Sequence, residues 1–106
     1  MNKLVLIDSS EPNERWGELL RFCVSNGIES AWLGPYDFRV GEFGPWDLLA
    51  ELAQADIEFL LSRTDWIVSD RDLLKKHAAA MQVPYIAADK ATMMEEVKAA
   101  WERTLH

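Results

Sequence analysis

Short apolar runs alternate with longer amphipathic stretches along the whole chain. The short runs are typical of strands buried in a parallel sheet, and they predict strands at residues 3–7, 28–33, 66–69 and 83–87. Between and after them, apolar residues recur with helical spacing, which predicts helices through residues 16–24, 48–60, 73–81 and 93–105. Strand and helix therefore alternate from one end of the chain to the other.

This alternation predicts one α/β domain over residues 1–106, built as three layers, α/β/α, around a four-stranded parallel sheet. Right-handed crossovers favour the strand order 2-1-3-4. The first and third strands are then neighbours, and their carboxyl ends meet at the switch point where such folds bind ligands.

Turn and cap residues mark the helix ends. Residues 9–12, Ser-Ser-Glu-Pro, indicate the start of the first helix, and Gly27 indicates its end. Asp47 can cap the second helix, and either Asp70 or Asp72 can cap the third.

One loop stands apart in composition. Residues 34–45 hold three of the five glycines and two of the four prolines. Tyr36, Phe38 and Phe43 lie in this loop, and Trp46 follows it. Such a loop either packs its own aromatic rings as a small satellite core or presents them to a partner. In the second case, these four residues are the candidate partner-binding residues.

The charge narrows the classes of ligand. The chain has a formal net charge of −7 and a pI near 4.7. Non-specific binding to nucleic acid or to anionic membranes needs clustered Lys and Arg, so this balance argues against both. It still allows an enzyme that binds phosphates through a divalent cation, or a protein that docks on a basic partner.

The cysteine count and the start of the chain bear on location. Cys23, the one cysteine, excludes an internal disulfide, and its place on an apolar helix stripe indicates core packing. The first apolar run is too short for a signal peptide, and no apolar run approaches the roughly 20 residues of a membrane span. We therefore expect a cytoplasmic protein without membrane contact.

Acidic residues provide the candidate chemistry. Asp8 and Asp70 follow the first and third strands, so their carboxylates are expected at the same edge of the sheet. Two such groups can coordinate Mg²⁺ or Mn²⁺, which prefer oxygen ligands. Asp56 occupies a helix position expected to be apolar, and Glu51 or Glu42 can complete a cluster of four acids. A metal held this way suits phosphodiester hydrolysis.

Two regions of the chain, the start and a discontinuous stretch further along, resemble a known family. LVLIDSS at the start, and ADIEFLL, DWIVSDRDLL and VPYI further along, are similar to the first strand and the C-terminal half of PIN-like nuclease domains. The resemblance implies a metal-dependent ribonuclease, with RNA as substrate and Asp8, Asp56 and Asp70 as catalytic residues. It further implies metal ligands among Asp8, Asp56, Asp70 or Asp72, and Glu51 or Glu42. The chain departs from the family in having four expected strands where five are usual.

The chain also resembles receiver domains of two-component signalling, in the order of apolar and polar residues over residues 4–30, LVLIDSSEPNERWGELLRFCVSNGIES. The resemblance implies that Asp70 is the phospho-acceptor, that Glu11 or Asp8 is the metal-binding acid, and that Lys90 is the lysine of the receiver site. An alanine stands where a receiver has Ser or Thr after the fourth strand, and one strand–helix unit is missing.

Two alternatives need no metal. The aspartates can serve only as helix caps, turn residues and solvated groups. The chain can also be a non-enzymatic acidic binding protein, such as an immunity protein or an antitoxin that neutralises a basic nuclease toxin. The net charge of −7, the five tryptophans and the aromatic loop favour this second alternative.

Overall fold

The computed structural model describes residues 4–105, so Lys3 of the expected first strand and His106 lie outside the described residues. The elements follow one another in the order β1 (Leu4–Asp8), α1 (Arg15–Ser25), β2 (Ser30–Trp32), β3 (Tyr36–Asp37), β4 (Glu42–Phe43), α2 (Leu48–Glu51), α3 (Gln54–Ser62), β5 (Thr64–Ser69), α4 (Asp72–Ala80), β6 (Tyr85–Ala87) and α5 (Met93–Leu105).

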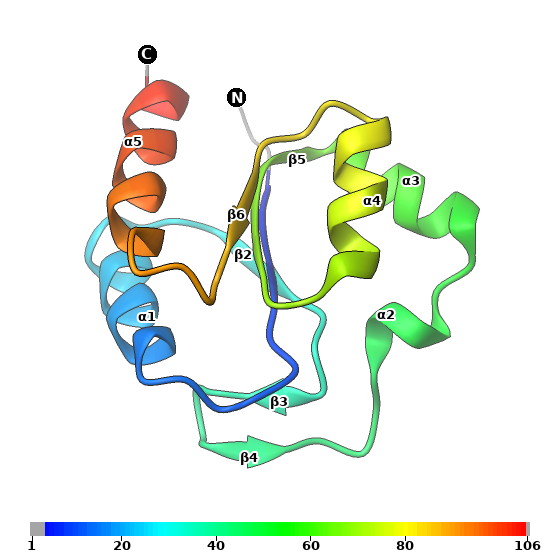
Figure 1. The fold of residues 1–106 in the computed structure, drawn as a ribbon, viewed down its shortest axis with the longest axis horizontal. Helices are drawn as coiled ribbons and strands as arrows, with labels where there is room; N and C mark the ends of the chain where they lie inside the picture. The colour runs from blue at the N-terminus through cyan, green and yellow to red at the C-terminus, as the bar shows by residue number, and fades with distance from the viewer. Residues whose placement is uncertain (1–3, 106) are drawn as a thin grey trace.

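The main sheet has four parallel strands in the order β2-β1-β5-β6. Helices α1 and α5 cover one face, and α2, α3 and α4 lie on the other side (Figure 1). Since β5 and β6 are the third and fourth strands of this sheet in chain order, the predicted α/β/α fold and the order 2-1-3-4 are confirmed. No helix in residues 4–105 is long and apolar enough to cross a membrane.

The strands divide their side chains between two cores. On β5, Trp66 and Val68 join the core under α1 and α5, whereas Ile67 joins the core under α3 and α4. Val5 and Leu6 on β1 divide in the same way. Because successive side chains point to opposite faces, a strand covered on both sides must be apolar throughout, which explains the continuous apolar runs.

The start of α1 differs from expectation, but its end does not. Gly27 has a φ of +64° just after the helix, a conformation that glycine adopts without strain. At the start, the capping position is Glu14, and it makes no side-chain cap. The serines predicted as a helix-start signal bond elsewhere, while the Asn13 side chain accepts a hydrogen bond from the Arg15 amide at 2.9 Å.

The single helix predicted over residues 48–60 is wrong, because two short helices occupy this stretch. Leu52 and Ala53 are extended and separate α2 from α3. The break redirects the chain so that Leu49 of α2 and Ile57 of α3 enter the same core. The predicted cap is confirmed: the Asp47 carboxylate accepts a hydrogen bond from the Ala50 amide at 3.4 Å.

The predicted cap of α4 is also wrong. Arg71 occupies the capping position and makes no side-chain cap. Asp72 lies in the first turn, exposed, where a negative charge still interacts favourably with the helix dipole. Asp70 precedes the cap, and its carboxylate bonds to another part of the chain.

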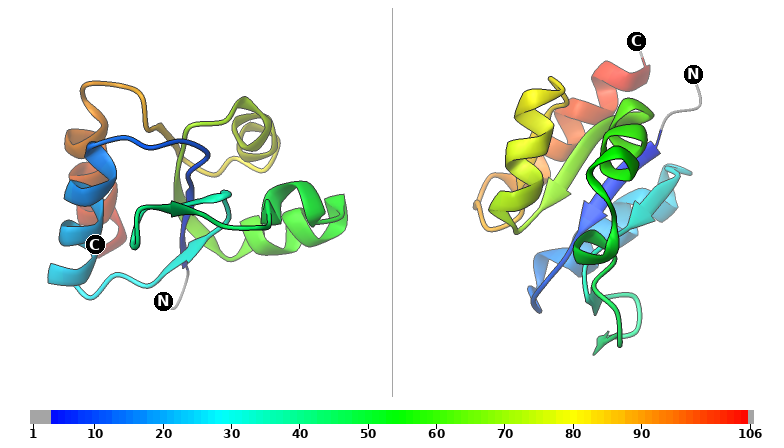
Figure 2. Two further views of the ribbon diagram at one scale, coloured as in Figure 1. Left: turned by 90° about the horizontal axis from the view of Figure 1, so that it is seen from below. Right: turned by 90° about the vertical axis from the view of Figure 1, so that its right-hand side faces the viewer.

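The glycine-rich loop contains a small hairpin. Strands β3 and β4 are antiparallel, with Tyr36 opposite Phe43 and Asp37 opposite Glu42. Gly41, with a φ of +75°, lies in the turn between them. The hairpin lies beyond the carboxyl ends of the main strands, beside the start of α2 (Figures 1 and 2).

Candidate functional site

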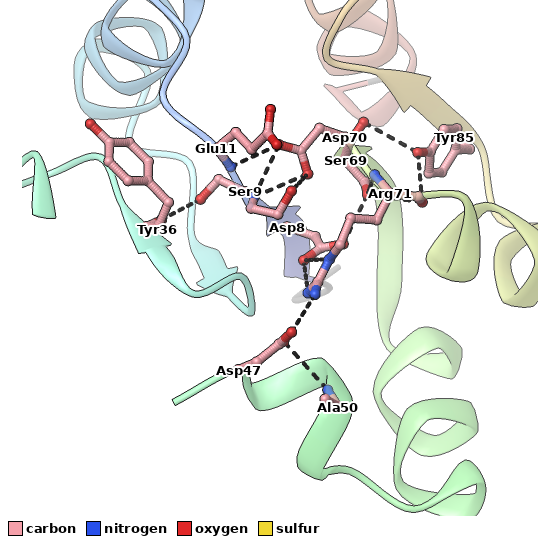
Figure 3. A network of polar contacts seen from close by, with 11 residues as sticks. Asp8, Ser9, Glu11, Tyr36, Asp47, Ala50, Ser69, Asp70, Arg71 and Tyr85 are labelled. Carbon is pink, nitrogen blue, oxygen red and sulfur yellow. Dashed lines mark hydrogen bonds and ion pairs between the residues drawn. The ribbon is translucent and has the colours of Figure 1, made fainter. Parts of the chain in front are cut away.

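A buried ion pair lies at the carboxyl ends of β1 and β5 (Figure 3). Asp8, the last residue of β1, has 0% of its surface exposed. The Arg71 Nε donates to both Asp8 carboxylate oxygens at 3.0 Å, and its Nη2 also bonds to Oδ1. The Ser69 hydroxyl donates to Asp8 Oδ2 at 2.9 Å. The buried carboxylate is therefore both neutralised and hydrogen-bonded, as a buried charge must be.

Arg71 bridges two acids. Its Nη1 lies 2.5 Å from the Asp47 carboxylate, so a single guanidinium joins the sheet edge to the start of α2. Burial opposes the charge of the guanidinium, but the hydrogen bonds to Asp8 and Asp47 outweigh it and raise the pKa of Arg71. The hydrogen bond from Arg71 in turn lowers the pKa of Asp47. Both of these groups are thus charged at neutral pH.

The backbone that carries Arg71 is held in place by β6 and β5. The Tyr85 hydroxyl donates to the carbonyl of Arg71 at 3.1 Å and to that of Ser69 at 3.2 Å. The Arg71 amide donates to the Ser69 hydroxyl at 3.0 Å. Burial raises the pKa of Tyr85, so its phenol remains a hydrogen-bond donor. The position of the guanidinium is therefore determined by contacts on both sides of it.

Asp70 bonds to the loop between β1 and α1. Its carboxylate accepts hydrogen bonds from the Ser10 amide at 3.0 Å, the Ser10 hydroxyl at 2.9 Å and the Glu11 amide at 3.2 Å. These bonds replace the helix cap that the sequence predicted. An open pocket of about 290 Å³ adjoins them, lined by Ser10, Glu11, Pro12, Asn13, Asp70 and Asp89.

The other predicted acids make no hydrogen bond to Asp8. Asp56, Glu51, Glu42 and Asp72 are all exposed. Within residues 4–105, no group of three or more His, Cys, Asp or Glu side chains is arranged to hold a metal ion. As arranged, the donor set does not fit Mg²⁺ or Mn²⁺, because Arg71 already occupies both oxygens of the most buried acid.

The four candidate partner-binding residues divide into two pairs. Phe38 stacks on Trp16 at 5.2 Å between centroids and lies 4.1 Å from Trp32, and Tyr36 also packs against this core. Phe43 and Trp46 are 62% and 67% exposed. The loop therefore forms no separate satellite core: Tyr36 and Phe38 join the core under α1 and α5, while Phe43 and Trp46 present an exposed surface.

We call the exposed part the hairpin surface. It consists of Val40, Phe43, Trp46 and Leu48, all large apolar side chains that are exposed. The edge of Phe43 contacts the Tyr36 ring at 5.1 Å between centroids. The surface therefore continues inward into the packed aromatic residues of the hairpin.

A pocket of about 180 Å³ lies beside the hairpin surface, and we call it the hairpin pocket. Its lining comprises Trp32, Gly34, Pro35, Tyr36, Asp37, Arg39, Gly44, Trp46 and Leu48. The Arg39 guanidinium lies 4.9 Å from the centre of the Trp32 ring and pairs with Asp37 at 2.9 Å. A cation thus already stacks on one aromatic residue of this pocket.

The hairpin is fastened to the main sheet by its first residues. The Tyr36 amide donates to the Ser9 carbonyl, and the Ser9 hydroxyl donates to the Tyr36 carbonyl. Gly34 passes so close that an added Cβ would lie 1.7 Å from the Ser9 carbonyl oxygen. Only glycine allows this approach of the two backbones, which holds the hairpin at the carboxyl edge.

The sequence reasoning missed both arginines, Arg71 and Arg39. The available signal for the first was its position between two aspartates directly after a buried strand, since a cation there can reach an acid on the neighbouring strand. For the second, the signal was an acid two residues earlier in an aromatic loop. In neither case does the sequence spacing indicate with which acid the arginine pairs.

Comparisons with protein-family models, with curated proteins and with solved structures give no match to this chain.

Proposed function

We propose that the chain is a non-enzymatic binding protein that docks on a basic protein through the hairpin surface. The observation that carries the proposal is the exposure of large apolar side chains between Val40 and Leu48. Single exposed apolar residues are ordinary, but a group of them is a mark of an interaction site. Here Trp46 and Leu48 line one pocket with Tyr36, and Phe43 contacts the Tyr36 ring. Trp and other aromatic residues are also the side chains that most often anchor protein interfaces.

The fixed geometry of the hairpin supports this proposal. The bonds between Ser9 and Tyr36, and the packing of Phe38 on Trp16 and Trp32, order the hairpin before any partner arrives. Ordering a loop on binding costs affinity, so a preformed surface binds more tightly for the same contacts.

The charge indicates the kind of partner. The chain carries a net charge of −7, and two exposed acids are close to the hairpin surface in the sequence: Glu42 between Val40 and Phe43, and Glu51 three residues after Leu48. Opposite charge accelerates association and excludes like-charged partners. A basic nuclease, neutralised by an immunity protein or antitoxin in the cytoplasm, has the required chemistry.

A PIN-like metal-dependent ribonuclease is the second candidate. Asp8 ends β1 and Asp70 follows the neighbouring strand β5, so both acids lie at one edge of the sheet, which favours this candidate. It requires Arg71 to release Asp8 so that Mg²⁺ or Mn²⁺ can bind there. A metal that binds the folded chain raises the melting temperature, and Asp8→Asn should abolish that effect. If neither cation at millimolar concentration shifts melting, this candidate fails.

The binding proposal is tested by affinity capture from a host lysate with matched variants. Phe43→Ala and Trp46→Ala alter the hairpin surface, whereas Phe59→Ala removes an equally exposed ring from α3 (64% against 62% for Phe43). We expect one basic protein to be retained by the parent chain and by Phe59→Ala, and to be lost from both hairpin variants. Retention should also weaken as salt is raised.

Two results would refute the binding proposal. One is the retention of no basic protein at low salt. The other is equal loss of the retained protein from the hairpin variants and from Phe59→Ala, since the hairpin surface would then have no special part. Circular dichroism of every variant ensures that folded chains are compared.

A further inference from the structure

We propose that the hairpin pocket receives an arginine side chain of the basic partner. The inference rests on the proposed function and names the group that the pocket recognises. Its evidence is the lining of the pocket, the cation already stacked there, and the charge of the chain.

The lining suits a guanidinium. Trp32, Tyr36 and Trp46 supply aromatic rings, and ring faces attract cations placed within about 6 Å of their centres. Arginine is the usual cation in such stacking because its planar group is weakly hydrated. Asp37 supplies a carboxylate, the group that a guanidinium binds through two parallel hydrogen bonds.

Arg39 serves as an internal stand-in for the partner's side chain. Its Nε and Nη2 each lie 2.9 Å from an Asp37 oxygen, while its carbon lies over the Trp32 ring. These contacts are the ones expected of a bound guanidinium. The hydrogen bonds from Arg39 lower the pKa of Asp37, so the carboxylate stays charged at neutral pH.

The stand-in can be exchanged. The Arg39 side chain is 50% exposed and that of Asp37 33% exposed. Exposed ion pairs of this kind contribute little to stability, since water competes for both charges. A partner arginine that is desolvated in an interface can therefore replace Arg39 on Asp37 or share the carboxylate with it.

Arg39→Ala should raise the affinity of the hairpin pocket for an external guanidinium, although it removes a residue that lines the pocket. Removing this residue frees Asp37 and the Trp32 ring, so the pocket should bind an external guanidinium more tightly. The probe is the peptide acetyl-Gly-Arg-Gly-amide, followed by the shifts of tryptophan indole N–H signals in ¹⁵N-edited NMR. Acetyl-Gly-Leu-Gly-amide is the uncharged control peptide.

Arg63→Ala is the matched variant, because Arg63 stacks over Phe59 on another part of the surface at 5.6 Å. It changes the net charge by the same amount and leaves the pocket intact. We expect Arg39→Ala to strengthen binding of the arginine peptide about threefold or more, in line with a cation–π contact. Arg63→Ala should change it little, and Asp37→Asn should weaken it.

Three outcomes would overturn the inference. They are weaker binding by Arg39→Ala, equal strengthening by Arg63→Ala, and no shift of the Trp32 or Trp46 signals at millimolar peptide. Each leaves the proposed function standing if partner capture still depends on Phe43 and Trp46. Loss of that dependence refutes the proposed function instead, so the two failures are distinguishable.

Discussion

Replacing Arg71 with methionine should destabilise the chain strongly, because it leaves the Asp8 carboxylate buried without its cation. Asp8 is 0% exposed, and among residues 4–105 only the Ser69 hydroxyl would remain as a side-chain donor to it. Removing one partner of a buried ion pair costs about 3–5 kcal/mol. The Arg71 side chain is 20% exposed, so water can reach part of the gap, and we expect the lower end, about 3 kcal/mol at pH 7.

The ion pair between Arg71 and Asp47 should contribute much less to the free energy of unfolding. The Asp47 side chain is 32% exposed, and ion pairs near the surface contribute about 0–1 kcal/mol. Asn is also an effective helix cap, so Asp47→Asn retains the capping role while weakening the ion pair. We therefore expect Asp47→Asn to cost less than about 1 kcal/mol.

Urea unfolding, followed by tryptophan fluorescence, measures both costs by linear extrapolation. The double variant Asp8→Asn/Arg71→Met removes both charges and should cost less than the sum of the single variants. If Arg71→Met costs less than about 1 kcal/mol at pH 7, or if the two substitutions are strictly additive, Arg71 does not stabilise the fold by neutralising the buried Asp8 carboxylate.

Three further predictions concern single groups. The hydrogen bond from Arg71 lowers the pKa of Asp47, so this pair stabilises the fold above the ordinary carboxyl pKa. The stabilisation is lost as the pH falls through the lowered pKa. The urea midpoints of the parent chain and Asp47→Asn should therefore converge in acid. Burial raises the pKa of Cys23 to about 11, so a thiol-specific disulfide reagent at pH 8 should react slowly with the native chain and rapidly in urea, and equal rates would contradict this. Gly34→Ala places a Cβ 1.7 Å from a neighbouring carbonyl oxygen and should cost about 1–3 kcal/mol in urea unfolding, whereas Gly44→Ala, with 3.7 Å of space, should be tolerated.

The fold could be predicted because its signals are local and repeated. The strands are apolar on both faces, and helix stripes such as Trp16, Leu19 and Cys23 recur with the helical period. Right-handed crossovers then leave few possible strand orders. The break between α2 and α3 could not be predicted, since Leu52 and Ala53 are both compatible with a helix and yet have extended backbones.

The candidate site was harder to predict because it depends on which charges pair across long separations. The sequence placed Asp8 and Asp70 at one edge correctly, and the strand register puts Asp8 beside Ser69. Spacing could not show that Arg71 would turn toward Asp8, or that Asp70 would bond to Ser10. An aspartate at a strand end can bind a metal, pair with an arginine or accept a hydrogen bond from a loop amide, and sequence spacing does not distinguish these three partners.

The buried ion pair and the hairpin surface are parts of one arrangement. Asp47 lies in the chain between Trp46 and Leu48, so the bond from Arg71 holds the segment that carries two of the four residues of the hairpin surface. Acids that the sequence suggested as metal ligands thereby support the geometry of the hairpin surface. On this argument Asp47→Asn, which keeps the helix cap, should lower partner capture moderately, while Trp46→Ala should abolish it. Full capture by Asp47→Asn would show that the surface does not depend on the ion pair.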